Sequence, residues 1–486
     1  MTRLVVVSNR VSLPEAGGAS QGGLAVAISA ALRQYSGLWF GWSGQAAPSF
    51  TGQIAMRRAE GVTAATIDLE EQDVQEYYNG YANRTLWPLF HYRIDLTAFE
   101  RSYGSGYARV NTRFAETLRP LIERDDMIWV QDYHLIPMAR ELRERGVKNA
   151  IGFFLHIPWP AREILVTLPR HRQLVESLFH YDVIGFHTQE WLEAFTAYIR
   201  YEADGEILPD GRLRAFGRTV RAVALPIGLD AKEFAEMAKS ASAQESFERM
   251  QESKLGRKML LGVDRLDYSK GLEERLLAYE RFLNDHPERL RDVFMLQIST
   301  HSRSDVEEYQ DISTRLDALS GRVNGAFAEM DWIPVRNVHR PHGRDELAGI
   351  YRAADVCLVT PLRDGMNLVA KEFVAAQTED DPGVLILSRF AGAASQMKQA
   401  LIVNPFSQED VADAINRALM MDSAERRERW MRERERRGLR QDRQEDQRQE
   451  RLRIARNLLE VIADDRLLAD RIGLSVEEVR GLRDGK

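Results

Sequence analysis

Cysteine is almost absent from this chain, since Cys357 is the only one among 486 residues. One thiol cannot form a disulfide within the chain, which excludes a disulfide-stabilised secreted fold and is consistent with a reducing compartment. Long apolar runs are also missing, because no stretch approaches the roughly 18 apolar residues of a membrane-spanning helix. Residues 1–7 lead straight into an apolar segment without a small-residue cleavage site, so we expect no signal peptide. These absences predict a cytoplasmic protein without a membrane partner.

Positive charge is not in excess, since 66 lysines and arginines stand against 73 aspartates and glutamates and the net charge is −7. This balance gives no reason to expect a nucleic-acid partner. No Asp-x-Asp motif follows a predicted strand, so the sequence implies no required metal ion and no cofactor. The remaining composition, 44% hydrophobic and 29% charged, is typical of a globular protein, and the length predicts more than one domain.

Short apolar runs alternate with amphipathic stretches along most of the chain. Continuous runs of this kind fit strands that are buried on both faces, and their alternation with helices predicts doubly wound parallel sheets. The runs fall into two sets, separated by mixed polar sequence near residues 203–222. The predicted strands are 4–7, 127–130, 151–155 and 183–186 in the first set, and 259–263, 293–298, 356–360, 384–387 and 401–403 in the second.

We therefore predict an α/β protein of two doubly wound parallel-sheet domains, residues 1–230 and 231–424, facing one another across a deep cleft. Ligands of such sheets bind outside the carboxyl ends of the strands. Residues 425–486 differ, because the run 440–451 contains no apolar residue and a helix that is polar all round cannot be held by core packing. We expect a charged helical tail of uncertain packing. Ser475-Val476-Glu477-Glu478 has the form of a capping box and predicts a short last helix.

The run from Pro361 to Phe373 follows a predicted buried strand and passes through Gly365 into the start of a helix. Free backbone N–H groups and the positive end of the helix dipole make such a loop an anion site. Two carboxylates, Asp364 and Glu372, flank it. A generic strand–loop–helix connection shares this outline, but the added acids favour a ligand with both phosphate and hydroxyl groups, such as a sugar nucleotide.

Four cations follow other predicted strands: Arg10, Arg265, Lys270 and Arg303. Arginine offers a planar fork to phosphate oxygens and lysine a point charge. Any one of them alone is equally compatible with a charged surface. Their common position at strand ends favours one cleft that binds one or two phosphate-rich ligands.

Polar residues also follow two strands of the first half, Asp132 after one and His156 after the next. A lone histidine at a strand end is commonly structural, but the pair on neighbouring strands favours a site. The glycine-rich stretch 17–24 could let backbone amides approach an anion. It is neither a dinucleotide-binding G-x-G-x-x-G nor a Walker sequence, and it fits a flexible surface loop equally well.

Ten short motifs follow one another over roughly residues 1–420. They are Val7–Arg10 (VSNR), Gly22–Ala25 (GGLA), Leu38–Gly44 (LWFGWSG), Glu76–Asn79 (EYYN), Leu86–Tyr92 (LWPLFHY), Asp132–Leu135 (DYHL), Gly152–Pro158 (GFFLHIP), Arg265–Gly271 (RLDYSKG), Ser302–Arg303 and Pro361–Glu372. In their order and spacing these motifs resemble those of the trehalose-6-phosphate synthase family. Its members are retaining glycosyltransferases with two facing Rossmann-like domains, the arrangement called GT-B.

The resemblance implies that residues 231–424 bind the donor UDP-glucose and residues 1–230 the acceptor glucose 6-phosphate. Catalysis would involve Asp132, His156, Arg265, Lys270 and Asp364. On the donor side, Arg265 and Lys270 would hold the diphosphate, the amides of Asn367, Leu368 and Val369 would contact phosphate, Glu372 would bind the ribose, and Asp364 and His156 would bind glucose hydroxyls. On the acceptor side, Arg10, Tyr78, Trp87 and Arg303 would hold glucose 6-phosphate, Asp132 would bind an acceptor hydroxyl, and Trp42 and Gly23 would shape the loop between the sugars.

The implied reaction forms α,α-trehalose 6-phosphate and UDP with retention. The family lacks an evident carboxylate nucleophile on the far face of the sugar, so we expect front-face attack. Two alternatives stay open: a sister enzyme that uses a glycerol phosphate or cyclitol phosphate acceptor, and a sugar-phosphate sensor without catalysis. The family also implies a homodimer or homotetramer. In this architecture the last helices normally return to the first domain, whereas residues 425–486 match no pattern of the family that we recognise.

Overall fold

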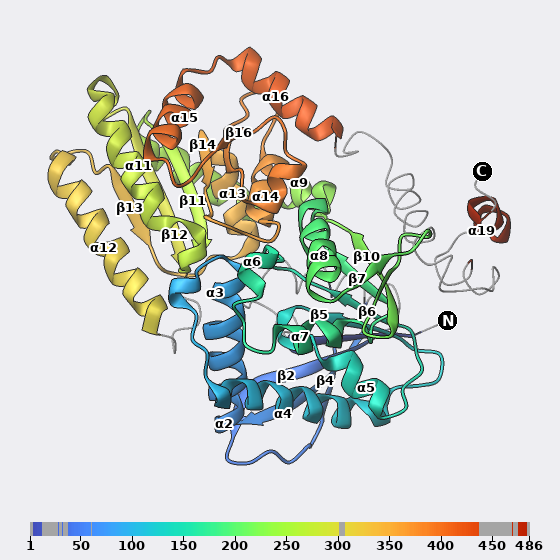
Figure 1. Ribbon diagram of the computed structural model, residues 1–486. Helices are drawn as coiled ribbons and strands as arrows, with labels where there is room; N and C mark the ends of the chain where they lie inside the picture. Colours follow the sequence, from blue (N-terminus) through green and yellow to red (C-terminus); the bar gives the residue numbers. More distant parts are fainter. Residues whose placement is uncertain are drawn as a thin grey trace.

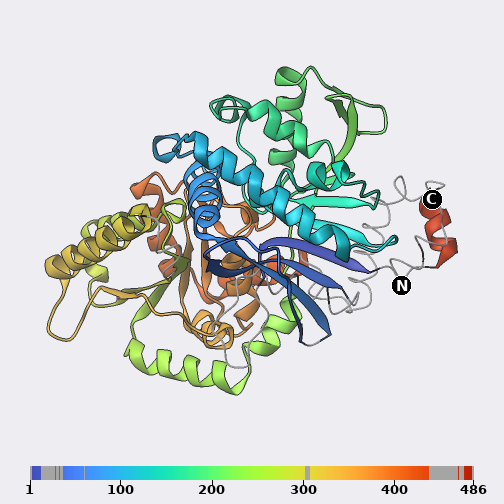
Figure 2. The same ribbon diagram turned by 90° about the horizontal axis from the view of Figure 1, so that it is seen from below.

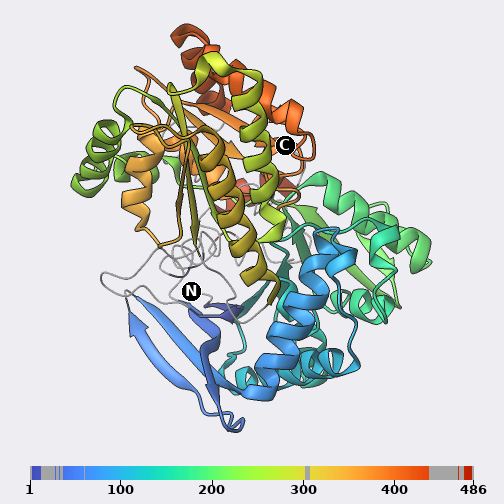
Figure 3. The same cartoon turned by 90° about the vertical axis from the view of Figure 1, so that its left-hand side faces the viewer.

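The protein has two sheets of mainly parallel strands, each covered by helices, and the sheets lie one above the other (Figures 1 and 3). The computed structural model describes residues 3–11, 28, 32, 37–59, 61–300, 307–436, 469 and 475–483. All nine apolar runs that we predicted as strands are strands. The boundary expected at residue 230 falls between the last strand of the first sheet and the first strand of the second.

The first sheet has ten strands among the described residues, in the order β3-β4-β2-β1-β5-β6-β7-β10-β9-β8. Its centre is parallel, and antiparallel pairs form both edges. The strands are β1 (Leu4–Arg10), β2 (Leu38–Ala47), β3 (Ala55–Ala59), β4 (Val62–Glu70), β5 (Met127–Gln131), β6 (Ile151–Phe154), β7 (Val183–Phe186), β8 (Glu206–Ile207), β9 (Leu213–Ala215) and β10 (Arg218–Ala224). The region near residues 203–222, expected as a polar gap, therefore forms the edge strands β8 to β10.

The second sheet is parallel throughout, in the order β13-β12-β11-β14-β15-β16. Its strands are β11 (Lys258–Arg265), β12 (Val293–Thr300), β13 (Val335–Val338), β14 (Val356–Val359), β15 (Val384–Ser388) and β16 (Leu401–Val403). The chain runs outward from β11 to β13 and returns on the other side of β11 with β14. The switch point of the sheet thus lies between β11 and β14, which is where parallel sheets bind ligands.

Helices cover the faces of both sheets and bury their apolar sides against the strands. None of those described has the length and apolar character of a membrane span. The first domain contains α2 (Glu71–Asp73), the π-helix η1 (Val74–Leu86), α3 (Trp87–Phe90), η2 (Ile94–Leu96), α4 (Arg101–Leu118), η3 (Arg119–Leu121), η4 (Tyr133–Leu135), α5 (Met138–Glu144), α6 (Arg162–Leu165), α7 (His171–Leu178) and α8 (Gln189–Glu202). The second contains α9 (Ala231–Met237), α10 (Ala241–Lys254), η5 (Tyr268–Lys270), α11 (Leu272–Asp285), η6 (Pro287–Arg289), α12 (Glu307–Phe327), α13 (Arg344–Ala353), α14 (Leu368–Ala376), η7 (Gly392–Ser395) and α15 (Gln408–Met420).

The first part of the predicted tail, α16 (Ser423–Arg436), packs on the second domain. Trp430 is 8% exposed, and its Nε1–H donates to the carbonyl oxygen of Val374 at 3.1 Å. A second contact joins the Glu433 carboxylate to the N–H of Gln399 at 3.1 Å. The part of this helix around Trp430 is therefore held by core packing, because one tryptophan interrupts its charged surface. The charged run 440–451 lies outside the described residues.

The predicted last helix is present as α19 (Val476–Arg483), and Figures 1 and 2 show it on the side of the molecule where β1 begins. The Ser475 hydroxyl accepts a hydrogen bond from the N–H of Glu478 at 3.2 Å, and the Glu478 carboxylate accepts one from the N–H of Ser475 at 2.8 Å. These reciprocal bonds are the capping box that the sequence predicted.

Candidate active site

The loops at the carboxyl ends of β11 and β14 meet the loops at the carboxyl ends of β5 and β6. The closest approach is at Gly365, where an added Cβ atom would stand 1.8 Å from the carbonyl oxygen of His156. Another Cβ on Gly392 would stand 1.9 Å from the carbonyl oxygen of Gly365. Glycine is therefore required at both positions by the close contact of the backbones. The two domains touch where the strand-end residues gather.

Lys270 and Asp364 form a buried ion pair between the two loops of the switch point. The Lys270 Nζ lies 2.6 Å from Asp364 Oδ2, and the side chains are only 10% and 13% exposed. The same Oδ2 accepts a hydrogen bond from Asn367 Nδ2 at 3.0 Å, and Oδ1 accepts one from the N–H of Gly365 at 2.8 Å. Burial opposes the charge of Asp364, but the Lys270 ammonium and these donors hold its pKa below the usual range.

Asn367 turns the loop into α14. Its backbone adopts φ +66°, and its side-chain oxygen caps the helix by accepting a hydrogen bond from the N–H of Ala370 at 3.4 Å. The first-turn N–H groups of Leu368 and Val369 have no acceptor within the helix and point towards its N-terminal end. The positive end of α14 therefore opens next to the Lys270–Asp364 pair, and the two features together suit an anion.

Arg275, which we did not predict as a site residue, links β11 and β14, the two strands of the switch point. Its guanidinium is fully buried and donates to Asp264 Oδ2 at 2.7 Å, at the end of β11, and to the Thr360 hydroxyl at 2.9 Å, after β14. A buried cation with these partners fixes the spacing of the loops that carry Lys270 and Asp364. No pattern in the sequence indicates this role, because Arg275 lies within an ordinary amphipathic helix.

Arg265 ends β11 and is exposed, and it makes no hydrogen bond or ion pair with a described residue. Its guanidinium carbon lies 5.8 Å from the ring centroid of Trp87 in the first domain, a cation–π contact across the cleft. Glu372 lies further along α14, with Oε1 3.4 Å from two nitrogens of Arg344. Burial raises the pKa of Glu372, and Arg344 offsets only part of that effect.

Asp132 and His156 lie side by side on the first domain. Asp132 adopts φ +72°, and its Oδ1 accepts a hydrogen bond from the backbone N–H of His156 at 3.1 Å. The imidazole Nε2 of His156 lies 2.9 Å from Gln131 Oε1, so this nitrogen carries the proton. Burial lowers the pKa of His156 to about 3, which keeps the ring neutral with a free lone pair on Nδ1.

The expected acceptor residues form a row of cation and rings along the first domain. The Arg10 guanidinium lies 5.7 Å from the ring centroid of Trp42, which packs edge-on against Tyr78 at 5.4 Å. Tyr78 in turn stacks on His134 at 6.0 Å. Gly44, at φ +93°, leaves the space that Arg10 fills, since an added Cβ would meet the guanidinium at 2.3 Å. Two expected site residues, Gly23 and Arg303, lie outside the described residues.

His91 is a site residue that the sequence reasoning missed, although it lies inside the motif Leu86–Tyr92. Its Nδ1–H donates to the carbonyl oxygen of Trp87 at 2.7 Å, and its buried Nε2 has no partner among the described residues. Burial lowers the pKa of His91 to about 4, while the charges of Asp267, Asp364 and Lys270 act on it from the second domain. His91 therefore keeps a neutral, buried acceptor nitrogen under the influence of charges from the second domain.

Further contacts join the domains around this cleft. The Arg363 guanidinium lies 3.7 Å from the ring centroid of Tyr92, and Lys371 Nζ donates to the carbonyl oxygen of Ile227 in the linker at 2.7 Å. Within the described ranges there is no group of three histidines, cysteines or acidic residues arranged to hold a metal ion. Two sheets of mainly parallel strands whose strand-end loops meet, with cations at the switch point of one of them, form the two-domain arrangement that the sequence predicts.

Relatives of known activity bear the same architecture. A family model for glycosyltransferase family 20 matches residues 4–442. The trehalose-6-phosphate synthase of Sinorhizobium fredii is 50% identical over 433 residues, which cover 88% of this chain and 93% of that protein. The chain belongs to glycosyltransferase family 20.

Solved structures agree with this assignment. The α,α-trehalose-phosphate synthase (UDP-forming) of Burkholderia xenovorans, in complex with glucose 6-phosphate, superposes with a TM-score of 0.85 at 50% identity, covering 88% of this chain and 94% of that one. The E. coli protein bound with UDP-2-fluoro glucose gives a TM-score of 0.85 at 45% identity, covering 89% and 94%. The match to residue 442 includes α16, so the family pattern extends beyond the limit near residue 420 that we recognised from sequence.

Proposed function

We propose that this protein is a retaining glucosyltransferase that converts UDP-glucose and glucose 6-phosphate into α,α-trehalose 6-phosphate and UDP. The observation that carries the proposal is the Lys270–Asp364 pair beside the N-terminus of α14, directly opposite His156 of the first domain. This arrangement suits a sugar whose hydroxyls meet carboxylate and imidazole while its diphosphate meets cations. The relatives bound to glucose 6-phosphate and to a fluorinated UDP-glucose support both substrates.

On the donor side, Arg265 and Lys270 hold the diphosphate, together with the amides of Asn367, Leu368 and Val369. Lys270 has three N–H donors and gives one to Asp364, which leaves two for phosphate oxygens. Glu372, kept beside Arg344, accepts hydrogen bonds from the ribose hydroxyls. The leaving UDP gains negative charge in the transition state, and these fixed donors stabilise that charge more than they stabilise the bound substrate.

On the sugar side, Asp364 and the Nδ1 lone pair of His156 accept hydrogen bonds from hydroxyls of the transferred glucose. Asp132 accepts one from the acceptor. Its Oδ1 accepts a hydrogen bond from the N–H of His156, which fixes the orientation of the carboxylate. The phosphate and ring of glucose 6-phosphate are held by Arg10, Tyr78, Trp87 and Arg303, while Gly23 and Trp42 shape the loop between the two sugars.

We propose front-face transfer, in which the acceptor hydroxyl enters on the side from which UDP leaves and the leaving phosphate takes its proton. Both oxygens of Asp364 already accept hydrogen bonds, and Lys270 neutralises the charge, so this carboxylate is a poor nucleophile. A mass-spectrometric search of the protein after incubation with UDP-2-fluoro-glucose tests the step. We expect no covalent sugar; an adduct on Asp132 or Asp364 would contradict it.

A UDP-release assay with a panel of acceptors tests the overall reaction. We expect release with glucose 6-phosphate and the product α,α-trehalose 6-phosphate, identified by NMR. Release with glycerol 3-phosphate or a cyclitol phosphate alone would assign a sister enzyme, and no release with any acceptor would favour a sensor. A cytoplasmic location, and assembly as a homodimer or homotetramer, belong to the same proposal; light scattering after gel filtration measures the oligomeric state.

A further inference from the structure

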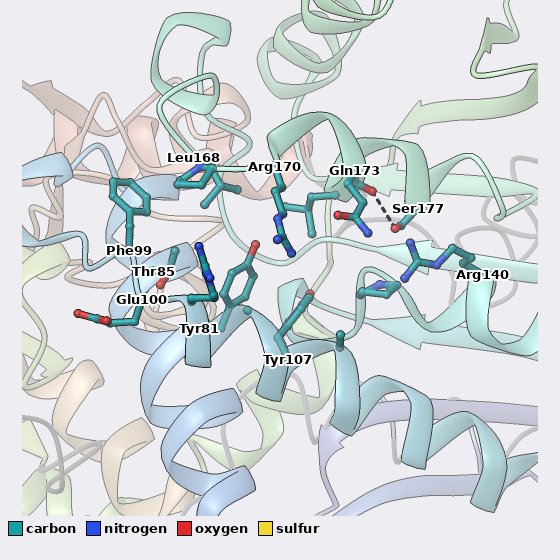
Figure 4. Close-up of a pocket in the computed structure, with 16 residues that line it drawn as sticks. Tyr81, Thr85, Phe99, Glu100, Tyr107, Arg140, Leu168, Arg170, Gln173 and Ser177 are labelled. Atoms are coloured by element: carbon teal, nitrogen blue, oxygen red, sulfur yellow. Dashed lines mark hydrogen bonds between the residues drawn. The ribbon is translucent and has the colours of Figure 1, made fainter.

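A second cavity lies within the first domain, away from the cleft residues. It is partly open, has a volume of about 470 Å³, and lies between the end of η1, the start of α4, α5, and α7 with the loop that precedes it (Figure 4). Cavities of this size commonly hold molecules from a monosaccharide to a nucleotide. None of the expected donor or acceptor residues lines it.

The walls of this cavity are positively charged. Arg101, Arg140 and Arg170 line it with a single carboxylate, Glu100, which leaves a net charge of +2. In Figure 4 the Glu100 side chain points away from Arg170. A cavity with surplus cations and little negative charge attracts an anionic ligand.

The arginines of the cavity are poorly paired, unlike their neighbours. Arg101 and Arg170 make no side-chain hydrogen bond or ion pair with a described residue. Arg140 reaches only Glu141 at 3.4 Å and Glu144 at 3.9 Å. By contrast, Arg109 on α4 contacts Glu76 at 2.8 Å, which is the ordinary way in which this domain neutralises an arginine.

Polar and aromatic groups complete the walls. Tyr81 and Tyr107 pack with their ring centroids 4.4 Å apart, and the Tyr81 side chain points towards Arg170 in Figure 4. Arg170 adopts φ +61°, a conformation that costs energy for a residue with a side chain. Burial raises the pKa of Tyr81 to about 12, so its hydroxyl remains a donor beside the arginines. An apolar ring face next to several donors suits a small organic anion.

We propose that this cavity is a second ligand site, for a phosphate monoester of monosaccharide to nucleotide size, and that its occupation modulates the cleft. Arginine forks and a tyrosine hydroxyl match the oxygens of a phosphate, and the tyrosine faces accommodate a sugar or base. Tyr81 and Thr85 belong to η1, which also carries Tyr78 and ends directly before Trp87. A ligand that shifts η1 therefore also moves Tyr78, and so changes the acceptor side of the cleft.

A second connection runs through Tyr107. Its hydroxyl donates to the carbonyl oxygen of Tyr133 at 2.6 Å and accepts a hydrogen bond from the N–H of Ile136 at 3.3 Å. Tyr133 directly follows Asp132. The cavity wall is thus hydrogen-bonded to the loop that carries one of the residues expected to bind the acceptor.

Isothermal titration calorimetry with the full-length protein tests the binding step. The probes are inorganic phosphate, glucose 6-phosphate, fructose 6-phosphate, 5′-AMP and, as a carboxylate comparator, citrate. We expect at least one phosphate ester to bind wild type and to lose about tenfold or more in affinity in the double variant Arg101→Ala/Arg170→Ala, because two charge-assisted contacts are removed. Arg200→Ala, an exposed arginine of α8, is the matched control and should leave that affinity unchanged.

The variant Arg10→Ala distinguishes binding in the cleft from binding in the second cavity. It should weaken acceptor binding in the cleft and leave the second site unchanged. If no probe binds in a way that depends on Arg101 and Arg170, or if citrate alone does, the site is not one for phosphate esters. This binding measurement does not depend on the proposed function.

The proposed modulation rests on the proposed function and is tested by kinetics. Adding the bound ester should change the KM for glucose 6-phosphate or kcat at least twofold in wild type and not in the double variant. An unchanged rate would overturn the modulation while leaving the site.

Discussion

At the scale of single residues, Asp364 and Glu372 show how one loop and its helix create opposite conditions for two carboxylates. The Asp364 pKa lies below its usual range because Lys270, Asn367 and a backbone N–H stabilise the charge against burial. The Glu372 pKa is raised, because burial outweighs its longer contacts with Arg344. The two acids therefore suit different tasks.

We expect Glu372→Ala to act mainly on donor binding and Asp364→Ala mainly on the rate. Losing the ribose contacts should raise the KM for UDP-glucose by about tenfold with a small change in kcat, whereas removing Asp364 also frees Lys270 and should lower kcat by about a hundredfold. Steady-state kinetics at saturating acceptor measure both, with Asp364→Asn as a control that keeps the shape. Identical kinetic defects in the two alanine variants would show that the division of roles is wrong.

Buried neutral histidines predict an acid-sensitive fold. The pKa values of His91 and His156 are lowered to about 4 and about 3, whereas in the unfolded chain they titrate near 6.5. The unfolded chain therefore binds protons that the folded one does not, and the free energy of unfolding falls as the pH drops below about 6.5, by about 1.4 kcal/mol per pH unit for each group.

His91→Gln should reduce the slope of the free energy of unfolding against pH by the contribution of about one proton. The variant keeps a donor for the Trp87 carbonyl oxygen and removes one titrating group. Urea unfolding at several pH values between about 7 and 4.5 measures the slope. An unchanged slope in His91→Gln would mean that this histidine is already charged in the folded protein.

At the scale of elements, the sequence patterns identified the strands that are continuous apolar runs and missed others, including the inner strands β2 and β4. A run such as 384–387 is apolar on both faces, and burial on both faces leaves that signature. By contrast, β4 mixes polar and apolar residues, β3 and β10 carry arginines, and β13 is short and half polar. Their pairing partners, rather than their own residues, make them strands.

Gly365 connects an element to its function, because its missing side chain lets the loop after β14 reach the first domain. Gly365→Ala would place a methyl group against the carbonyl oxygen of His156 and force the domains apart. We expect kcat to fall by about tenfold or more, since a displacement of this kind moves Asp364 from the sugar. Gly321→Ala, with open space around the new methyl group on α12, should leave kcat unchanged. Equal activity of both variants would refute the requirement for close contact.

Trp430 anchors α16, so its removal should destabilise the second domain. Trp430→Ala should lower the free energy of unfolding by about 3–5 kcal/mol, the usual loss for a buried tryptophan. Trp430→Phe keeps a ring and should cost less, although the bond to the Val374 carbonyl is lost. Deleting residues 425–486 should cost at least as much as Trp430→Ala. A deletion without effect on stability would show that the helix is dispensable.

At the scale of the whole molecule, the two sheets could be predicted but their contacts could not. Alternating apolar runs predict doubly wound sheets, and strand-end residues predict a site for each of them. Which loop of one domain meets which loop of the other depends on their relative placement, and no local pattern encodes it. His91 and Arg363 were missed for this reason: the charges that act on His91, and the ring that Arg363 contacts, lie on the opposite domain.

The charge of the cleft predicts transfer without a metal ion. In the proposed mechanism, Arg265, Lys270 and the end of α14 supply the positive charge that a departing diphosphate needs. Treatment with EDTA should therefore leave turnover within about twofold of its original value. UDP release before and after chelation measures this. Loss of activity that is restored by magnesium would show that a cation takes part.

The π-helix η1 has a consequence for how the molecule distributes its tyrosines. With roughly 4.4 residues per turn, residues three apart are rotated well away from each other, whereas in an α-helix they share a face. Tyr78 can therefore stack on His134 while Tyr81 packs against Tyr107. The winding of this one helix therefore places Tyr78 on the acceptor side and Tyr81 at the second cavity. A one-residue deletion that restored α-helical winding would turn both side chains towards the same side.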